Sequence, residues 1–267
     1  MNTPQESFPV APNAVYVWRG FRSPTLDYEQ FAQLLGSVFV PACVLLQPPV
    51  GLRAYLPTMM PQAGKPAAVP DQTALMFWAT PASHDRAMKA LAVRIYQNLH
   101  GDVYDMTRSK LPEVPVALDP HADALVAEQP YFLIDRAADW MLGSAKHFVG
   151  ARRANLRAAD FLAAVHVWAT SFQIEPPNGV DGALVCCGED YVAAWIHGTY
   201  PQPRPCPVLD QLAALTTPVL RMAPRPLALP AGLWDDWSGL DLTRDTCINL
   251  QFPRPRTSRA APREPEA

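Results

Sequence analysis

The chain lacks most of the sequence features that assign a function directly. Its 267 residues contain no Walker A loop and no G-x-S-x-G, G-x-G-x-x-G or H-E-x-x-H motif. The five cysteines have no C-x-x-C spacing, which argues against a cysteine-rich zinc site, and we expect no metal. There is no secretory signal and no run of roughly 18–20 apolar residues. We therefore expect reduced thiols, a cytoplasmic protein and no membrane partner.

A strong excess of either charge is also missing. The sequence has 22 basic and 25 acidic residues, a formal net charge of −3, which gives no electrostatic reason to expect nucleic acid as a partner. Glycine is scarce, with 13 residues, whereas proline is abundant, with 30. The prolines gather between the periodic segments, where they end helices and strands.

The periodic segments of the first half predict the order βαββαβ. Four segments are typical of strands: 14–21, 51–56, 72–79 and 102–108. The first helix is expected to begin at Asp27, with Gln30 completing a capping box. The second helix is expected to run from Ser83 to His100 and to bury an apolar stripe of Met88, Leu91, Ile95 and Leu99.

A shift of 130 residues places a second copy of this pattern on the first. The segment 20–31 then aligns with 150–161, and four pairs are identical: Gly20/Gly150, Arg22/Arg152, Leu26/Leu156 and Phe31/Phe161. We therefore predict an α+β fold of two tandem ferredoxin-like βαββαβ units that form an intramolecular α/β barrel. The expected divisions are unit 1 at 14–110, a proline-rich linker at 111–139, unit 2 at 140–225, and a C-terminal extension at 226–267 that ends in a disordered basic tail.

Both faces of the predicted strands are apolar, so both faces need cover. Helices cover one face of a ferredoxin-like sheet, and the simplest cover for the other face is the second sheet. The side chains between the sheets would then line a central cavity in which a small molecule binds.

With these blocks in place, the chain resembles the dimeric α/β-barrel superfamily, and within it the antibiotic-biosynthesis-monooxygenase and EthD-like proteins. The resemblance rests on segments 15–31 and 148–161 and on the strands around Trp78 and Trp195. It implies a small-molecule enzyme, a cofactor-independent oxygenase, isomerase or decarboxylase, acting on an apolar or aromatic substrate in the cavity between the sheets. Such a barrel is a monomer or a homodimer. Similarity of this kind indicates a fold rather than a reaction.

Two other functions remain open. The first is a non-catalytic binding or assembly protein whose barrel is filled by its own side chains. The second, a minor alternative, is a haem-binding protein with His147 or His197 as the ligand. The haem branch of the superfamily has a G-x-x-D-G segment, and residues 178–182 depart from it at the first glycine.

Seven strand residues are the candidates for the site. The predicted catalytic residues are His147, His197, Tyr55 and Arg19. The predicted substrate-binding residues are Trp18, Trp78 and Trp195. Six of them have a structural alternative: the histidines can bond backbone carbonyls, Arg19 can pair with a carboxylate or reach solvent, and the tryptophans can fill the core.

Overall fold

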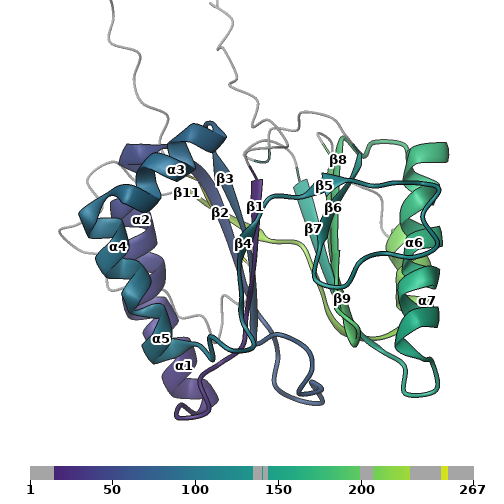
Figure 1. The fold of residues 1–267 in the computed structure, drawn as a ribbon, viewed down its shortest axis with the longest axis horizontal. Helices are drawn as coiled ribbons and strands as arrows, with labels where there is room; N and C mark the ends of the chain where they lie inside the picture. Colours follow the sequence, from purple (N-terminus) through teal and green to yellow (C-terminus); the bar gives the residue numbers. More distant parts are fainter. Residues whose placement is uncertain (1–14, 135–139, 141–143, 199–206, 229–247, 252–267) are drawn as a thin grey trace, which may run out of the picture.

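The computed structural model describes residues 15–134, 140, 144–198, 207–228 and 248–251. The fold is mixed α+β. Two six-stranded sheets stand face to face, and helices cover the outer face of each sheet (Figure 1).

Seven short helical segments of the described residues cover the first sheet. Its strands follow the order β11-β12-β2-β3-β1-β4. Their bounds are β1 Val15–Gly20, β2 Leu52–Met59, β3 Gln72–Trp78, β4 Lys110–Glu113, β11 Arg225–Ala228 and β12 Ile248–Gln251. The helical segments are α1 Tyr28–Leu34, the π-helix η2 Leu35–Phe39, α2 Val40–Leu46, the 3-10 helix η3 Pro48–Val50, α3 Pro81–Lys89, α4 Leu91–Asn98 and α5 His100–Val103.

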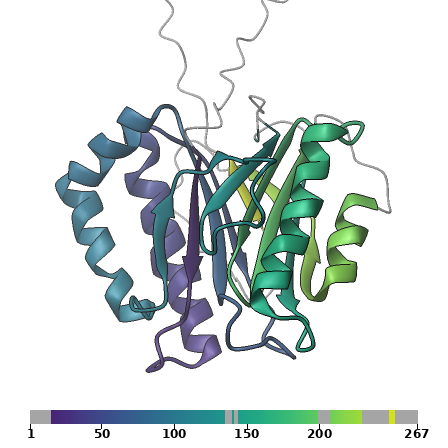
Figure 2. The same cartoon turned by 45° about the vertical axis from the view of Figure 1, so that its right-hand side comes forward.

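The second sheet is covered by two helices, α6 Ala158–Ile174 and α7 Pro207–Leu215, which Figure 2 brings forward. Its strands follow the order β10-β7-β9-β8-β6-β5. Their bounds are β5 Val116–Ala117, β6 Pro130–Ile134, β7 Ser144–Arg152, β8 Gly182–Cys187, β9 Tyr191–Gly198 and β10 Thr216–Met222.

Four strands of each sheet, β1 to β4 in the first and β7 to β10 in the second, have the same order. In each half the fourth strand lies beside the first, the first beside the third, and the third beside the second. The first and third strands also pair in the same register, because Gly20 lies opposite Gln72 and Gly150 lies opposite Val192. Positions in one half therefore have defined counterparts in the other.

The turn that follows the first strand repeats as well. Arg22 donates to the carbonyl of Leu26, and Arg152 donates to the carbonyl of Leu156. A Cβ on Gly20 would meet Trp18 Nε1 at 2.7 Å and the ring of a neighbouring tyrosine, so only glycine fits there. Gly150 is equally crowded.

The predicted capping box is confirmed. The Asp27 side chain accepts from the Gln30 backbone at 2.8 Å, and the Gln30 side chain accepts from the Asp27 backbone at 3.0 Å. This reciprocal pair satisfies two amides that no carbonyl of the helix can reach.

Buried apolar side chains of both sheets lie in the space between them. The inward residues of both sheets form one apolar cluster, which includes Val17, Leu75, Phe77, Val149 and Trp195. These described residues contribute large side chains to the region where the sequence predicted an open central cavity.

The second helix of the first half differs from its prediction. Thr80, rather than Ser83, caps it, and the helix breaks at Ala90, whose backbone is extended. The break turns Val93 and Tyr96 toward the core. Three residues of the predicted core stripe consequently face outward, with Leu91 72%, Ile95 57% and Leu99 37% exposed, whereas Met88 packs against the core. The fourth strand begins at residue 110 because residues 100–103 form α5 instead of a strand.

The predicted linker at 111–139 and the predicted extension at 226–267 both contribute strands. β5 and β6 extend the second sheet, and β11 and β12 extend the first. An edge strand leaves backbone groups unpaired, and these additions satisfy them. The expected disordered tail lies outside the described residues.

One helical stretch, Tyr28–Val50, is long and apolar enough to cross a membrane by length and composition. The sequence predicts no continuous apolar run of this length, because polar residues such as Gln33 and Ser37 interrupt the stretch. Half of the stretch is buried inside the protein, where it packs against the first sheet.

Candidate functional site

The structure divides the seven predicted site residues between two places. Trp18, Tyr55 and Trp78 point from the first sheet toward its helices. Arg19, His147, Trp195 and His197 point between the sheets. The division follows from strand geometry, because neighbouring residues such as Trp18 and Arg19 face opposite sides of a sheet.

His147 ties the two sheets together. Its Nδ1 lies 3.0 Å from the carbonyl of Ala194, which can only accept, so Nδ1 carries the proton. Its Nε2 then accepts from the Thr73 hydroxyl of the first sheet at 3.0 Å. Burial lowers the pKa of His147 to about 4. Both nitrogens are occupied, so His147 has no free atom for a substrate or a haem iron.

Arg19 is a second link between the halves. Its guanidinium, fully buried, lies 3.2 Å from the carboxylates of Glu113 and Glu128 and 2.9 Å from the Glu128 carbonyl. Of the alternatives that the sequence left open, pairing with carboxylates is the one observed. The charge is neutralised within the protein, which removes the need for an anionic substrate.

His197 and Trp195 complete the inward group. His197 Nδ1 forms a hydrogen bond with the Asp181 carboxylate. The centroid of the His197 ring lies 4.9 Å from the ring centroid of Trp140. The Trp195 ring stacks on His147 with centroids 4.5 Å apart. Trp195 therefore belongs to the packed interface of the sheets.

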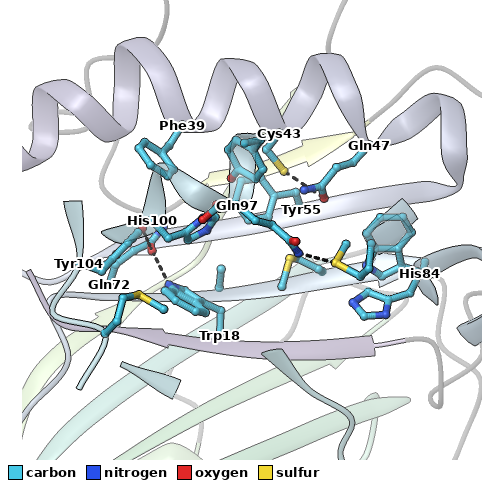
Figure 3. Close-up of a pocket in the computed structure, with 16 residues that line it drawn as sticks. Trp18, Phe39, Cys43, Gln47, Tyr55, Gln72, His84, Gln97, His100 and Tyr104 are labelled. Atoms are coloured by element: carbon cyan, nitrogen blue, oxygen red, sulfur yellow. Dashed lines mark hydrogen bonds between the residues drawn. The ribbon is translucent and has the colours of Figure 1, made fainter. Parts of the chain in front are cut away.

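A cavity of about 390 Å³ lies on the other side of the first sheet, between the sheet and its helices (Figure 3). Strand side chains form its floor: Trp18, Tyr55, Gln72, Ala74, Met76 and Trp78. Residues of the helices and of the chain after α5 form the rest of its wall: Phe39, Cys43, Gln47, His84, Met88, Tyr96, Gln97, His100, Tyr104 and Met106. Three predicted residues thus line a cavity that the sequence did not locate.

Gln72 is the centre of the polar contacts in this cavity. Its Oε1 accepts hydrogen bonds from Trp18 Nε1 at 3.0 Å and from the Tyr104 hydroxyl at 2.6 Å. Its Nε2 is buried with no hydrogen-bond partner among the described residues. The indole nitrogen of Trp78 is also buried without a hydrogen-bond partner among the described residues. Buried polar groups are normally paired, so two unpaired donors on one cavity wall call for an explanation.

The titratable groups of the cavity are uncharged at neutral pH. Burial raises the pKa of the Tyr55, Tyr96 and Tyr104 phenols and of the Cys43 thiol. Burial also lowers the pKa of His84 and His100. The lining contains no aspartate, glutamate, lysine or arginine. The cavity is therefore aromatic, neutral and rich in hydrogen-bond donors.

Sequence reasoning missed Gln72, His84, His100, Tyr96 and Tyr104. The two histidines lie at helix ends, where solvent contact is the usual expectation. The signal that was available is the alternation along β3, which places Gln72 on the same face as Trp78. Among the described residues, no cluster of three histidine, cysteine or acidic side chains is placed to hold a metal.

Comparisons with known proteins add a distant similarity. No family model matches the chain, and no curated protein matches it. A solved "putative monooxygenase" from Lactobacillus acidophilus NCFM aligns over 78% of this chain and 90% of its own, with 8% identity and a TM-score of 0.31.

Two further solved structures align in the same way. A "putative monooxygenase" from Fusobacterium nucleatum subsp. nucleatum covers 69% of this chain and 75% of its own, with 9% identity and a TM-score of 0.29. An "anthrone oxidase-like protein" covers 78% of this chain and 87% of its own, with 8% identity and a TM-score of 0.31. Similarities of this size do not identify a function.

Proposed function

We propose that this protein is a small-molecule enzyme whose site is the cavity between the first sheet and its helices. Its substrate is an uncharged aromatic molecule. The observation that carries the proposal is the lining, which combines aromatic walls with neutral imidazoles and phenols and has no charged side chain.

His100 is the proposed proton acceptor. Its Nδ1 faces the Gln97 carbonyl at 3.0 Å, so Nδ1 carries the proton and Nε2 keeps a lone pair. The lowered pKa keeps the ring neutral near pH 7, which is the form that accepts a proton. Proton transfer is a step common to the cofactor-independent oxygenases, isomerases and decarboxylases expected from the sequence.

The fold that we infer is a pair of tandem ferredoxin-like units derived by duplication, with the sheets closed against each other as in a dimeric α/β barrel. The shared strand order, the shared register and the repeated glycine–arginine turn support this inference. We also propose a cytoplasmic monomer or homodimer. The described cysteines are free and buried, which fits a reducing environment.

A proton-exchange assay tests the proposed chemistry. Anthrone, a tricyclic ketone with an acidic C–H bond, is incubated with the protein in D₂O, and deuterium uptake is followed by NMR. We expect uptake above the background rate and a loss of that acceleration in His100→Ala. The matched control is His121→Ala, because His121 is exposed and outside the cavity. Exchange at the background rate with the wild-type protein contradicts the role of His100.

Binding without catalysis is the second candidate function. It is favoured by the cluster of buried apolar side chains between the sheets, because a barrel filled by its own side chains is the feature expected of a non-catalytic member. In that case aromatic ligands would bind in the cavity, and no exchange would follow. A haem group, the minor alternative, would take His197 as its ligand, because both ring nitrogens of His147 are hydrogen-bonded, and would give a Soret band in the absorption spectrum.

A further inference from the structure

We propose that the cavity selects a long, flat, uncharged molecule with a hydrogen-bond acceptor at each end, and that Gln72 determines specificity at one end. This inference rests on the proposed function, because it names the substrate class of the same cavity. It follows from which polar atoms of the lining residues already have a hydrogen-bond partner and from where the atoms without a partner lie.

The orientation of the Gln72 amide is fixed by its neighbours. The Trp18 indole nitrogen can only donate, so it must meet the amide oxygen. The Tyr104 hydroxyl donates to the same oxygen. A flipped amide would place two donors against each other, so the Gln72 NH₂ group must point elsewhere. That group is buried and has no hydrogen-bond partner among the described residues, and Gln72 is one of the residues that line the cavity.

The Tyr55 phenol lies close to the unpaired amide. Burial raises the pKa of Tyr55, and the Gln72 amide opposes this rise, as a nearby donor does. Tyr55 also lines the cavity. Tyr55 lies opposite Met76 on the neighbouring strand, between the Gln72 and Trp78 ends of the cavity. The donor at the Gln72 end is therefore the amide itself.

Trp78 supplies a donor at the other end. Its indole is 1% exposed, and its Nε1 has no partner among the described residues. The His84 ring stands perpendicular to it, with centroids 5.3 Å apart. Figure 3 shows Gln72 and His84 at opposite ends of the cavity.

The distance between the two ends sets the length of the ligand. Gln72 and Trp78 are six residues apart on one face of β3, which corresponds to roughly 20 Å between their Cα atoms. The floor between them consists of Ala74 and Met76, which are apolar. A single ring cannot reach both donors, whereas several fused rings with an oxygen at each end can. An amine at either end would meet a donor, and a carboxylate would find no cation.

A binding experiment with three matched probes tests this inference. The probes are anthracene, 2,6-diacetylanthracene with a ketone at each end, and 2,6-diaminoanthracene with an amine at each end. Binding is followed by quenching of tryptophan fluorescence. We expect the diketone to bind at least tenfold more tightly than anthracene and the diamine to bind no better than anthracene, since each neutral hydrogen bond contributes about a three- to tenfold gain.

Variants assign the gain to each donor. Gln72→Leu and Trp78→Phe should each weaken diketone binding about three- to tenfold and change anthracene binding less than about twofold. Trp195→Phe is the matched control. Its indole nitrogen is also buried and unpaired among the described residues, but it lies between the sheets. It should leave binding of all three probes unchanged.

The outcomes separate this inference from the proposed function. Equal binding of the diketone and anthracene, or equal weakening of both by Gln72→Leu, overturns the inference and leaves the cavity as a binding site. Failure of all three probes to bind rejects the proposed function itself. The comparison of the three probes with the wild-type protein needs no variant, so a Gln72→Leu protein that does not fold leaves the test intact.

Discussion

The two halves of the molecule share a framework and differ in the residues that face their helices. The register of the paired strands makes Trp18, Tyr55 and Gln72 of the first half the counterparts of Phe148, Ala183 and Val192 of the second. The first set donates and accepts hydrogen bonds, and the second set cannot do so through its side chains. The same strand order therefore supports an aromatic cavity with hydrogen-bonding groups in the first half and an apolar core in the second.

The helices explain how the space arises. In the second half, α6 runs unbroken for 17 residues and packs Phe161, Val165 and Phe172 against the sheet. In the first half, the π-helix η2 interrupts the first helix, and the extended residue Ala90 interrupts the second. A continuous helix covers its sheet, whereas interrupted helices leave room above it. The comparison teaches that a cavity can arise on a shared strand framework when both the helices and the residues that face them change.

The largest expected effect concerns the contact between the halves. Arg19→Met leaves two carboxylates without their partner and should lower the free energy of unfolding by about 3 kcal/mol, at the low end for a broken buried pair because both carboxylates are partly exposed. Urea denaturation of the wild-type and variant proteins measures this change in the free energy of unfolding. Ligand binding in the cavity should not change in the folded protein. A loss of binding without a loss of stability would place Arg19 in the site.

The second prediction compares Ala74 with its counterpart Ala194. Ala74 lies on the cavity floor, and Ala194 lies in the packed core of the second half. Ala194→Phe should destabilise the protein by about 3 kcal/mol through overpacking. Ala74→Phe should cost less than about 1 kcal/mol, since its ring enters the cavity, and should abolish ligand binding. Equal destabilisation by the two changes would show that the two halves are packed alike.

A third prediction uses His147, whose counterpart in the first half is Val17. The folded pKa of about 4 lies below the usual 6.5, so the unfolded chain binds the extra proton first and stability falls as pH drops from 6.5 toward 4. At pH 5 the loss from this residue is about 2 kcal/mol relative to pH 7. His147→Gln should reduce the slope of stability against pH. An unchanged slope would mean that His147 is not buried and neutral.

The smallest effect distinguishes the two helix layers. Ile95→Ser on α4 should change the free energy of unfolding by less than about 0.5 kcal/mol, because Ile95 is 57% exposed. Val165→Ser on α6, which is fully buried, should cost about 2 kcal/mol or more. A large loss in the first variant would indicate that the exposed stripe is buried in the folded protein.

Local signals in the sequence were enough for the mixed α+β fold and the first capping box. They depend on residues close together in the chain, such as Asp27 and Gln30, whose chemistry sets the geometry. The strands β11 and β12 were missed because their pairing with the first sheet joins segments far apart in sequence, which no local pattern reveals.

The candidate site was predicted only in part, for a related reason. Trp18, Tyr55 and Trp78 were identified as strand residues, but the open face was assigned to the space between the sheets. Which face stays open depends on the breaks at η2 and Ala90, and neither has a strong signal in the sequence. The position of His84 and His100 in the cavity wall depends on how the helices pack on the sheet, which the sequence does not reveal.

The central claim is that ligand occupies the space between the first sheet and its helices. A crystal structure of the protein with 2,6-diacetylanthracene tests it most directly. We expect the probe to lie against Trp18, Tyr55 and Gln72, with one ketone oxygen accepting a hydrogen bond from the Gln72 amide. A probe lodged between the two sheets, beside His147 and Trp195, would contradict it.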